Sequence, residues 1–262
     1  MIMGVQRSGS TALLRSFAKN CKLVTLDEGM DTPVFQGFNL RPESEIRELL
    51  KSIKATVVFK SINETNRRNV EDVIQEYKNY DLWILWIYRD PVNVFYSDCK
   101  MSNRPLSSVY SFISQWNQRN QYILSAYWKY NSKIVIVKYE DLLSDPKVFF
   151  KICRLLNVKG RYIFYRDSSK GRKDLPDRIK DDVDKGTLHI LTKLDKNRRF
   201  VSKINFPTVL LRILLRMYLE IEKYKSFLKR IGLRNALGAV YKVIIGKKKP
   251  RELWNSIKNY LY

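Results

Sequence analysis

The stretch that decides the fold is Met1-Ile2-Met3-Gly4-Val5-Gln6-Arg7-Ser8-Gly9-Ser10-Thr11-Ala12-Leu13-Leu14. Three apolar residues precede a loop bounded by Gly4 and Gly9, and an apolar helical pattern follows the loop. This order predicts a strand, a tight turn and a helix. In such a turn several backbone N–H groups converge at the N-terminus of a helix, where the helix dipole favours negative charge. The stretch therefore predicts a phosphate or sulfate site, with an ordinary Gly/Ser turn that binds nothing as the alternative.

The loop departs at one position from the nucleotide-binding pattern G-x-x-x-x-G-K-[ST]. The two glycines have the required spacing, and Thr11 occupies the Ser/Thr position. Ser10, however, stands where the pattern has the lysine that contacts the β- and γ-phosphates. Arg7 offers a cation from inside the loop instead. The loop therefore predicts a bound anion other than Mg-ATP or Mg-GTP.

Composition limits the classes of protein to consider. The 262 residues are 45% hydrophobic, which allows one sizeable domain plus an appendage. The net charge of +23 predicts an anionic substrate or cofactor, a polyanionic partner or a membrane surface. No zinc-finger spacing, RNA-recognition signature or basic heptad arm is present, which argues against nucleic acid as the partner.

Cysteine and histidine usage indicates a reducing compartment and no metal. Cys21, Cys99 and Cys153 are widely spaced without a CxxC pair, and His189 is the only histidine. Because the loop begins at residue 4, we expect no signal peptide before it. No apolar run reaches the roughly 18 residues of a membrane span. These features predict a cytoplasmic protein, with a peripheral position on the membrane as an extension of that prediction.

Strand and helix patterns alternate along the first part of the chain. Apolar runs predict strands at 22–26, 55–60, 82–88 and 133–138, and helical periodicity predicts helices at 12–19, 42–53, 65–77, 92–101, 106–129 and 147–156. This alternation predicts an α/β fold with a P-loop-like parallel sheet flanked by helices. Ligands bind at the carboxyl ends of the strands in such sheets.

Four charged residues follow predicted strands directly or within a short loop. They are Arg7, Glu28, Lys60 and Arg89. Because parallel strands end at one edge of the sheet, we expect these side chains to belong to one site.

The C-terminal part changes character, which predicts domains at 1–204 and 205–262. From Lys203 onward there are 14 Lys and Arg against three Asp and Glu, and Pro207 begins a long amphipathic pattern. We expect a basic helical extension that packs on the core or on a second subunit. The alternative is an amphipathic element on anionic lipid. The basic run at 168–173 is interpreted as a solvated surface turn.

Three stretches together resemble the PAPS-dependent sulfotransferases, where PAPS is 3′-phosphoadenosine 5′-phosphosulfate. Residues 6–14 look like the 5′-phosphosulfate-binding loop of that family. Residues 88–97 resemble its 3′-phosphate motif R-D-P-x-x-x-x-x-S. Residues 137–146 are similar to its strand and turn ending in Y-E-D-L. The order and spacing agree as well, and the resemblance covers residues 1–156.

The resemblance implies PAPS as sulfuryl donor and assigns residues to it. The 5′-phosphosulfate would be held by Arg7, Ser8, Gly9, Ser10 and Thr11, and the 3′-phosphate by Arg89 and Ser97. The residues themselves support the second pairing, because arginine offers a rigid fork of donors to phosphate. Ser97 also lies two turns into the following helix, on the face that Arg89 is expected to approach. The alternative for Arg89 is a strand-end ion pair.

The resemblance also implies a base and a cation for the transfer. Glu28 follows the second strand, where many family members keep a glutamate, and we assign it general-base catalysis. Asp27 and Asp31 are competing candidates, and an exposed acidic turn is the alternative. No carboxylate cluster suggests a metal.

Lys60 matches a lysine after the third strand in related enzymes. It could stabilise the bridging oxygen of the donor, a role that Arg7 could share, or merely neutralise Glu64. With no histidine before residue 189, the chain resembles the carbohydrate- or lipid-directed branch more than the phenol- and steroid-directed one. A hydroxyl or amine acceptor that is carbohydrate or lipid-linked is therefore expected, with its determinants in loops 27–41, 101–106 and 157–204.

Two other classes of protein remain as alternatives. A P-loop kinase or NTPase would need the lysine missing at Ser10 and an acidic metal ligand, for which Asp90 is the candidate. A non-enzymatic protein that binds membrane or nucleic acid would explain the charge, but not three ordered motifs. The sequence leaves the oligomeric state open.

Overall fold

The computed structural model describes residues 1–18, 22–29, 31–102, 105, 108–164, 183 and 185–200. The predicted basic extension at 205–262, the basic run at 168–173 and Cys21 lie outside these residues. The domain boundary after residue 204 therefore stays a prediction.

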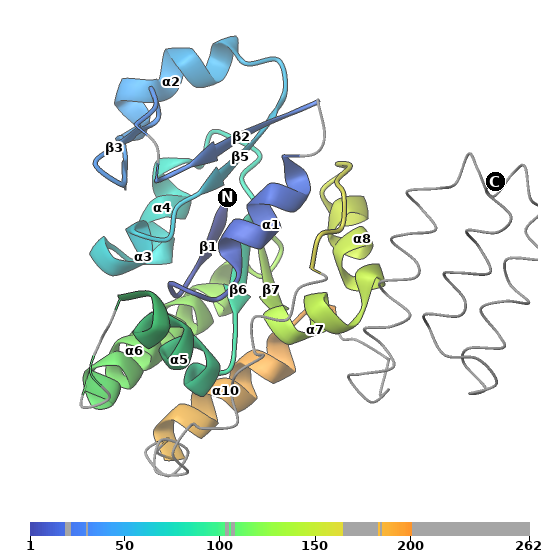
Figure 1. The fold of residues 1–262 in the computed structure, drawn as a ribbon. Coiled ribbons are helices and arrows are strands. Elements are labelled where there is room, and N and C mark those ends of the chain that lie inside the picture. The colour runs from blue at the N-terminus through green and yellow to red at the C-terminus, as the bar shows by residue number, and fades with distance from the viewer. Residues whose placement is uncertain are drawn as a thin grey trace, which may run out of the picture. The chain divides into compact units, whose positions relative to one another are not determined.

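Five parallel strands form the central sheet. They are β1 (Ile2–Gly4), β2 (Leu23–Asp27), β5 (Thr56–Lys60), β6 (Ile84–Tyr88) and β7 (Ile134–Lys138), in the order β2-β5-β1-β6-β7. A separate hairpin consists of β3 (Phe35–Gln36) and β4 (Asn39–Leu40). The predicted α/β fold with a parallel sheet is confirmed (Figure 1).

Helices connect the strands and flank the sheet (Figure 1). They are α1 (Ser10–Phe17), α2 (Glu43–Ser52), α3 (Glu64–Arg67), α4 (Val70–Glu76), α5 (Pro91–Ser102), α6 (Val109–Tyr130), α7 (Tyr139–Ser144), α8 (Pro146–Leu155) and α10 (Lys185–Asn197). Among the described helices, none has the length and apolar character that crossing a bilayer requires.

Two predicted segments differ from the structure. The single helix predicted at 65–77 is split into α3 and α4, because Arg68 and Asn69 have extended backbone conformations. The extended Arg68 donates to Glu64 on one side and to Glu76 on the other, so side-chain ion pairs hold the break. The turn predicted after β7 is the short helix α7.

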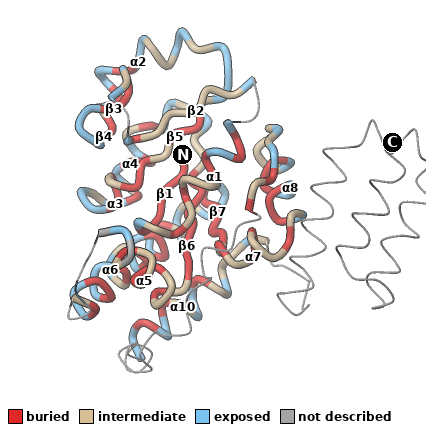
Figure 2. Tube along the Cα trace, viewed as in Figure 1, coloured by how far each residue is buried: buried red, intermediate tan, exposed pale blue. Residues whose placement is uncertain are grey.

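The two faces of the sheet bury different side chains. Met3, Trp86 and Ile136 belong to a core cluster that also holds apolar residues of α4, α6 and α10. The indole Nε1 of Trp86 donates to Asn120 Oδ1 of α6 at 3.0 Å. On the opposite face α1 packs against β1, β2 and β5, and its Phe17 ring lies 5.5 Å from that of Phe149 in α8. The central strands are consequently buried, as Figure 2 shows.

Candidate functional site

The loop between β1 and α1 has a backbone shape that depends on Gly9. Gly9 has a φ of 98°, and a Cβ there would lie 2.2 Å from the ring of Tyr139. Arg7 also has a left-handed φ, of 68°, which costs a residue with a side chain roughly 1–3 kcal/mol. Ser8 is buried, and both its N–H and its hydroxyl donate to Val5 O. The loop is thus a strained, internally bonded turn that leads directly into the N-terminus of α1.

Arg7 contacts the helix that follows β6. Its Nε donates to Ser97 Oγ of α5 at 3.4 Å. Ser97 therefore contacts the loop as well as lying on the helix that follows Arg89, and its predicted role beside Arg89 stays a prediction. The left-handed backbone at Arg7 was not readable from the sequence, and it turns the side chain towards α5.

Arg89 is a buried cation at the end of β6. The residue is only 5% exposed, and its guanidinium carbon lies 4.7 Å from the centre of the Tyr139 ring. Its Nε is 3.9 Å from Glu140 Oε1 and has no hydrogen-bond partner among the described residues. The ion pair predicted as the alternative at this strand end is therefore present but long. Buried donors are normally satisfied, so this Nε has room for a hydrogen bond to an anion that the described residues do not provide.

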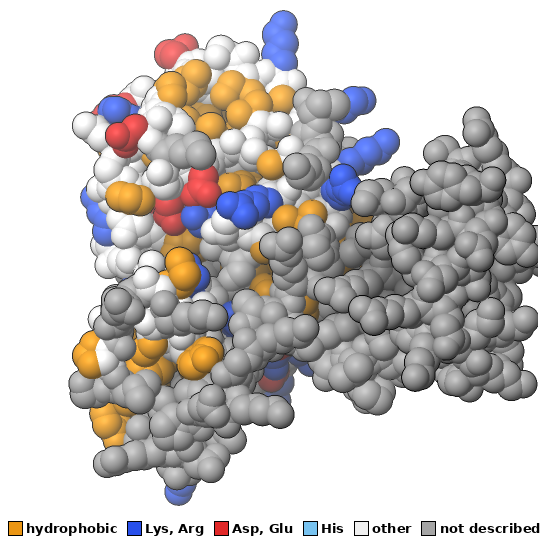
Figure 3. Space-filling view, viewed as in Figure 1, with side chains coloured by type: hydrophobic (Ala, Val, Ile, Leu, Met, Phe, Trp, Pro, Cys, Tyr) orange, Lys and Arg blue, Asp and Glu red, His pale blue; other side chains and the backbone are white. Residues whose placement is uncertain are grey.

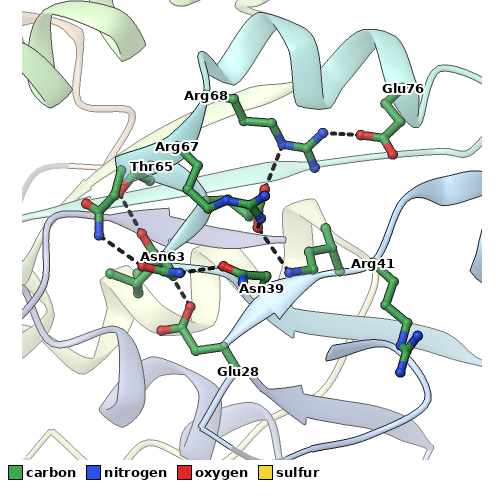
Figure 4. A network of polar contacts seen from close by, with 12 residues as sticks. Glu28, Asn39, Arg41, Asn63, Thr65, Arg67, Arg68 and Glu76 are labelled. Carbon is green, nitrogen blue, oxygen red and sulfur yellow. Dashed lines mark hydrogen bonds and ion pairs between the residues drawn. The ribbon is translucent and has the colours of Figure 1, made fainter. Parts of the chain in front are cut away.

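Glu28 is a buried carboxylate just beyond β2. Its Oε2 accepts a hydrogen bond of 2.8 Å from the backbone N–H of Asn63, and its Oε1 lies 3.5 Å from Lys60 Nζ. Burial raises the pKa of Glu28, although the Asn63 amide and Lys60 act in the opposite direction. Figure 4 shows Glu28 with Asn63, which in turn donates from its side chain to Asn39.

The neighbouring acidic residues have other partners. Asp27 Oδ1 lies 2.7 Å from Lys60 Nζ and also accepts from Gly29 N. Asp31 Oδ1 accepts from Gly37 N in the β3–β4 turn. Of the three candidate bases, Glu28 is the one that is buried.

The suggestion that Lys60 neutralises Glu64 is wrong. Glu64 accepts instead from Leu40 N, Arg67 and Arg68. Lys60 is held by Asp27 and Glu28. The reason is that Glu64 begins α3 and faces the hairpin, whereas Lys60 ends β5.

The strand ends bring the predicted site residues to one edge of the sheet. Lys60 pairs in register with Asp27 of β2 and with Ile2 of β1, and all five strands run the same way. The placement of Arg7, Glu28 and Arg89 after parallel strands is confirmed. In Figure 3 acidic and basic side chains lie side by side near the centre of the face shown. The roles of these residues, and those of Ser10 and Thr11 at the start of α1, stay predictions.

Asn63 and the ring of Tyr139 are site features that the sequence did not indicate. Asn63 lies three residues beyond β5, so a polar residue soon after a strand end was a usable signal. Tyr139 is the tyrosine of the Y-E-D-L stretch, and nothing in the sequence indicates that its ring lies against both Gly9 and Arg89. His189 is exposed on α10. Among the described residues no group of three His, Cys, Asp or Glu could hold a metal ion.

The geometry offers two anion-binding positions. One is the turn before α1, with Arg7 beside it, and the other is the buried guanidinium of Arg89. Tyr139 contacts both, because its ring meets Gly9 on the loop and Arg89 after β6. This arrangement fits a nucleotide that carries anionic groups at two positions.

Comparison with known proteins identifies solved structures that have a similar fold. No protein-family model matches the sequence, and no curated protein matches it. The structure is similar to that of a sulfotransferase from Alicyclobacillus acidocaldarius, with a TM-score of 0.51 and 15% identity, covering 76% of this chain and 96% of that chain. The chain has the sulfotransferase fold.

Two further structures are similar to this sulfotransferase fold at lower scores. Mouse sulfotransferase SULT7A1 complexed with PAP has a TM-score of 0.45 and 13% identity, covering 76% of this chain and 82% of that chain. The sulfotransferase domain of the Synechococcus PCC 7002 olefin synthase has a TM-score of 0.43 and 19% identity, covering 82% and 93%.

Proposed function

We propose that this protein transfers a sulfuryl group from PAPS to a hydroxyl or amine acceptor, carbohydrate or lipid-linked, without a metal. The observation that carries the proposal is the pair of anion positions on a sulfotransferase fold: a turn without the NTPase lysine, and a buried Arg89 whose Nε has no hydrogen-bond partner among the described residues. The loop residues Arg7 to Thr11 would hold the 5′-phosphosulfate. Arg89 and Ser97 would hold the 3′-phosphate, and Ser97 also accepts a hydrogen bond from Arg7 of the loop.

The donor supplies an activated sulfuryl group on its 5′-phosphate. Glu28 takes the proton of the acceptor hydroxyl as the acceptor oxygen bonds to sulfur and the bond from sulfur to the phosphate oxygen breaks. Lys60, held 3.5 Å from Glu28, and Arg7 stabilise the charge that develops on the departing phosphate oxygen. The raised pKa of Glu28 makes it a stronger base than an exposed carboxylate.

Thermal unfolding with 3′-phosphoadenosine 5′-phosphate (PAP), Mg-ATP or buffer alone tests the donor class. At about 100 times its dissociation constant, PAP should add roughly 2.7 kcal/mol to the free energy of unfolding. Arg89→Met should lose most of that shift, whereas Arg15→Met, on the exposed side of α1, should keep it. A shift with Mg-ATP alone would favour the kinase or NTPase alternative. No shift with either nucleotide would contradict both nucleotide-binding hypotheses.

Contact of residues 205–262 with anionic lipid is a second, independent proposal. It rests on their composition of 13 Lys and Arg against three Asp and Glu. Sedimentation of the full chain with phosphatidylserine vesicles, compared with neutral vesicles, tests it. If the protein is cytoplasmic and binds the membrane peripherally through these residues, it should sediment with the anionic vesicles only.

A further inference from the structure

A polar groove lies between the α3–α4 segment and α6. It has a volume of about 610 Å³. One wall consists of residues 65–69 and 72, and the other of Gln115, Gln118, Arg119 and Tyr122. The α6 residues are spaced i, i+3, i+4 and i+7, so they share one face of that helix.

The groove lining suits hydroxyl groups. None of its residues is aliphatic, and four of them are side-chain amides: Asn66, Asn69, Gln115 and Gln118. An amide both donates and accepts, as a hydroxyl does, so amides can pair with sugar hydroxyls in either direction. An alkyl chain in the same groove would cover these groups without pairing them, which is costly. The lining therefore favours a carbohydrate over a lipid chain.

Two arginines of the groove, Arg67 and Arg68, are held in place by carboxylates outside it. Arg67 Nη1 lies 3.3 Å from Glu64, and Arg68 pairs with both Glu64 and Glu76 (Figure 4). These ion pairs balance the charge of the arginines and fix their planes. Arg119 donates to Gln115 Oε1 across one helical turn at 3.4 Å. The guanidinium groups thus act as positioned hydrogen-bond donors more than as free cations.

The groove begins beside the proposed reaction centre. Asn66 Nδ2 donates to the side-chain Oδ1 of Asn63 at 3.1 Å, and the backbone N–H of Asn63 donates to Glu28. Thr65, another groove residue, donates from its hydroxyl to Gly4 O at the start of the anion-binding loop. One residue, Asn63, therefore separates the groove lining from the carboxylate that we propose as base.

We propose that this groove is the acceptor subsite and that it takes a hydroxyl-rich carbohydrate chain. The inference rests on the proposed sulfuryl transfer and selects between the carbohydrate and lipid-linked acceptors. Neutral sugar chains and sugar chains that bear carboxylates both present an array of hydroxyl groups, so the experiment below tests one of each kind.

The test compares two glutamines on the same helix. Gln118 lines the groove, whereas Gln121, equally exposed and three residues later, does not. Transfer of radiolabelled sulfur from PAPS is measured to a glucose hexasaccharide, to a hexasaccharide containing glucuronic acid, and to dodecanol. We expect an oligosaccharide to be labelled and Gln118→Leu to raise its KM about tenfold, the effect of roughly 1.4 kcal/mol. The kcat and the PAP affinity should stay unchanged, and Gln121→Leu should match the wild type.

The possible results separate this inference from the proposed function. Labelling of dodecanol alone, or equal KM values for the two variants, would overturn the carbohydrate subsite. Bound PAP with neither oligosaccharide labelled would also overturn it, and would leave the donor assignment standing. Absence of PAP binding would overturn both proposals.

Discussion

Glu28 lies where burial and a neighbouring cation act on its pKa in opposite directions, and burial prevails. A carboxyl whose pKa is raised by folding takes up a proton when the chain folds. Its contribution to stability is therefore most favourable below its unfolded pKa and diminishes as the pH rises through its folded pKa. The ionised form that the proposed chemistry needs is therefore the form that burial destabilises.

Glu28→Gln should abolish turnover without weakening the fold. The amide keeps the shape and removes the charge that burial disfavours, so the Tm should be unchanged or higher. PAP affinity should stay within about twofold of the wild type, a difference below 0.5 kcal/mol. Steady-state kinetics, calorimetry and a Tm measurement check this. Asp27→Asn is the matched comparison, and loss of turnover there with activity retained in Glu28→Gln would move the base to Asp27.

The pH profile of the wild type should show the same group. Because the base must be ionised, kcat/KM should fall as the pH drops through the raised pKa of Glu28. The slope of the fall should correspond to the uptake of one proton. The midpoint should lie above the ordinary glutamate pKa of about 4.3. A profile that stays flat down to that ordinary value would argue against a buried carboxylate base.

Tyr139 should act as a positioning residue for Arg89. Tyr139→Leu removes the ring that lies 4.7 Å from the guanidinium, a contact worth roughly 1–2 kcal/mol when desolvated. PAP affinity should fall about five- to thirtyfold, whereas affinity for AMP, which lacks the 3′-phosphate, should change much less. Tyr139→Phe keeps the ring and should behave like the wild type. An equal loss for PAP and AMP would indicate a general defect of the loop instead.

At the scale of elements, one buried carboxylate connects the β3–β4 hairpin to α3 and to the break between α3 and α4. Glu64 is 1% exposed and accepts from Leu40 N of β4 and from both arginines, 67 and 68. Glu64→Gln should lower the free energy of unfolding by about 3 kcal/mol, because it leaves these donors without their anion. Denaturant unfolding measures the loss. Glu48→Gln, which breaks the exposed pair with Lys51, should cost less than about 1 kcal/mol, and equal losses would contradict the role of burial.

Four strands of the sheet, β2, β5, β6 and β7, could be predicted from the sequence because each is an apolar run that ends in or just before a charged residue, whereas the β3–β4 hairpin was not predicted. Lys60 and Arg89 mark two of those ends, and the parallel order then places them at one edge. The break between α3 and α4 could not be predicted, since it depends on ion pairs from Arg68 to residues on both sides. The contact of Ser97 with Arg7 likewise depends on a left-handed backbone conformation. The groove joins two segments far apart in sequence, so the sequence alone did not indicate it.

At the scale of the whole molecule, the net charge of +23 should accelerate the encounter with an anionic donor. Raising the salt concentration from about 0.1 M to about 1 M shortens the Debye length from about 10 Å to about 3 Å. The association rate constant of PAP should then fall by about tenfold or more. Stopped-flow fluorescence on the full chain measures the rate, with uncharged adenosine as the control ligand. A rate independent of salt would show that the charge serves another partner.

The contact between Gly9 and Tyr139 also has a consequence for biosynthesis. The loop leaves the ribosome well before the ring that supports it, because that ring follows β7, the last described strand of the sheet to be made. β6 and β7 are neighbours, and both must be in place before Arg89 and Tyr139 can meet. A nascent chain should therefore gain its affinity for PAP late, only when the fifth strand has emerged and docked.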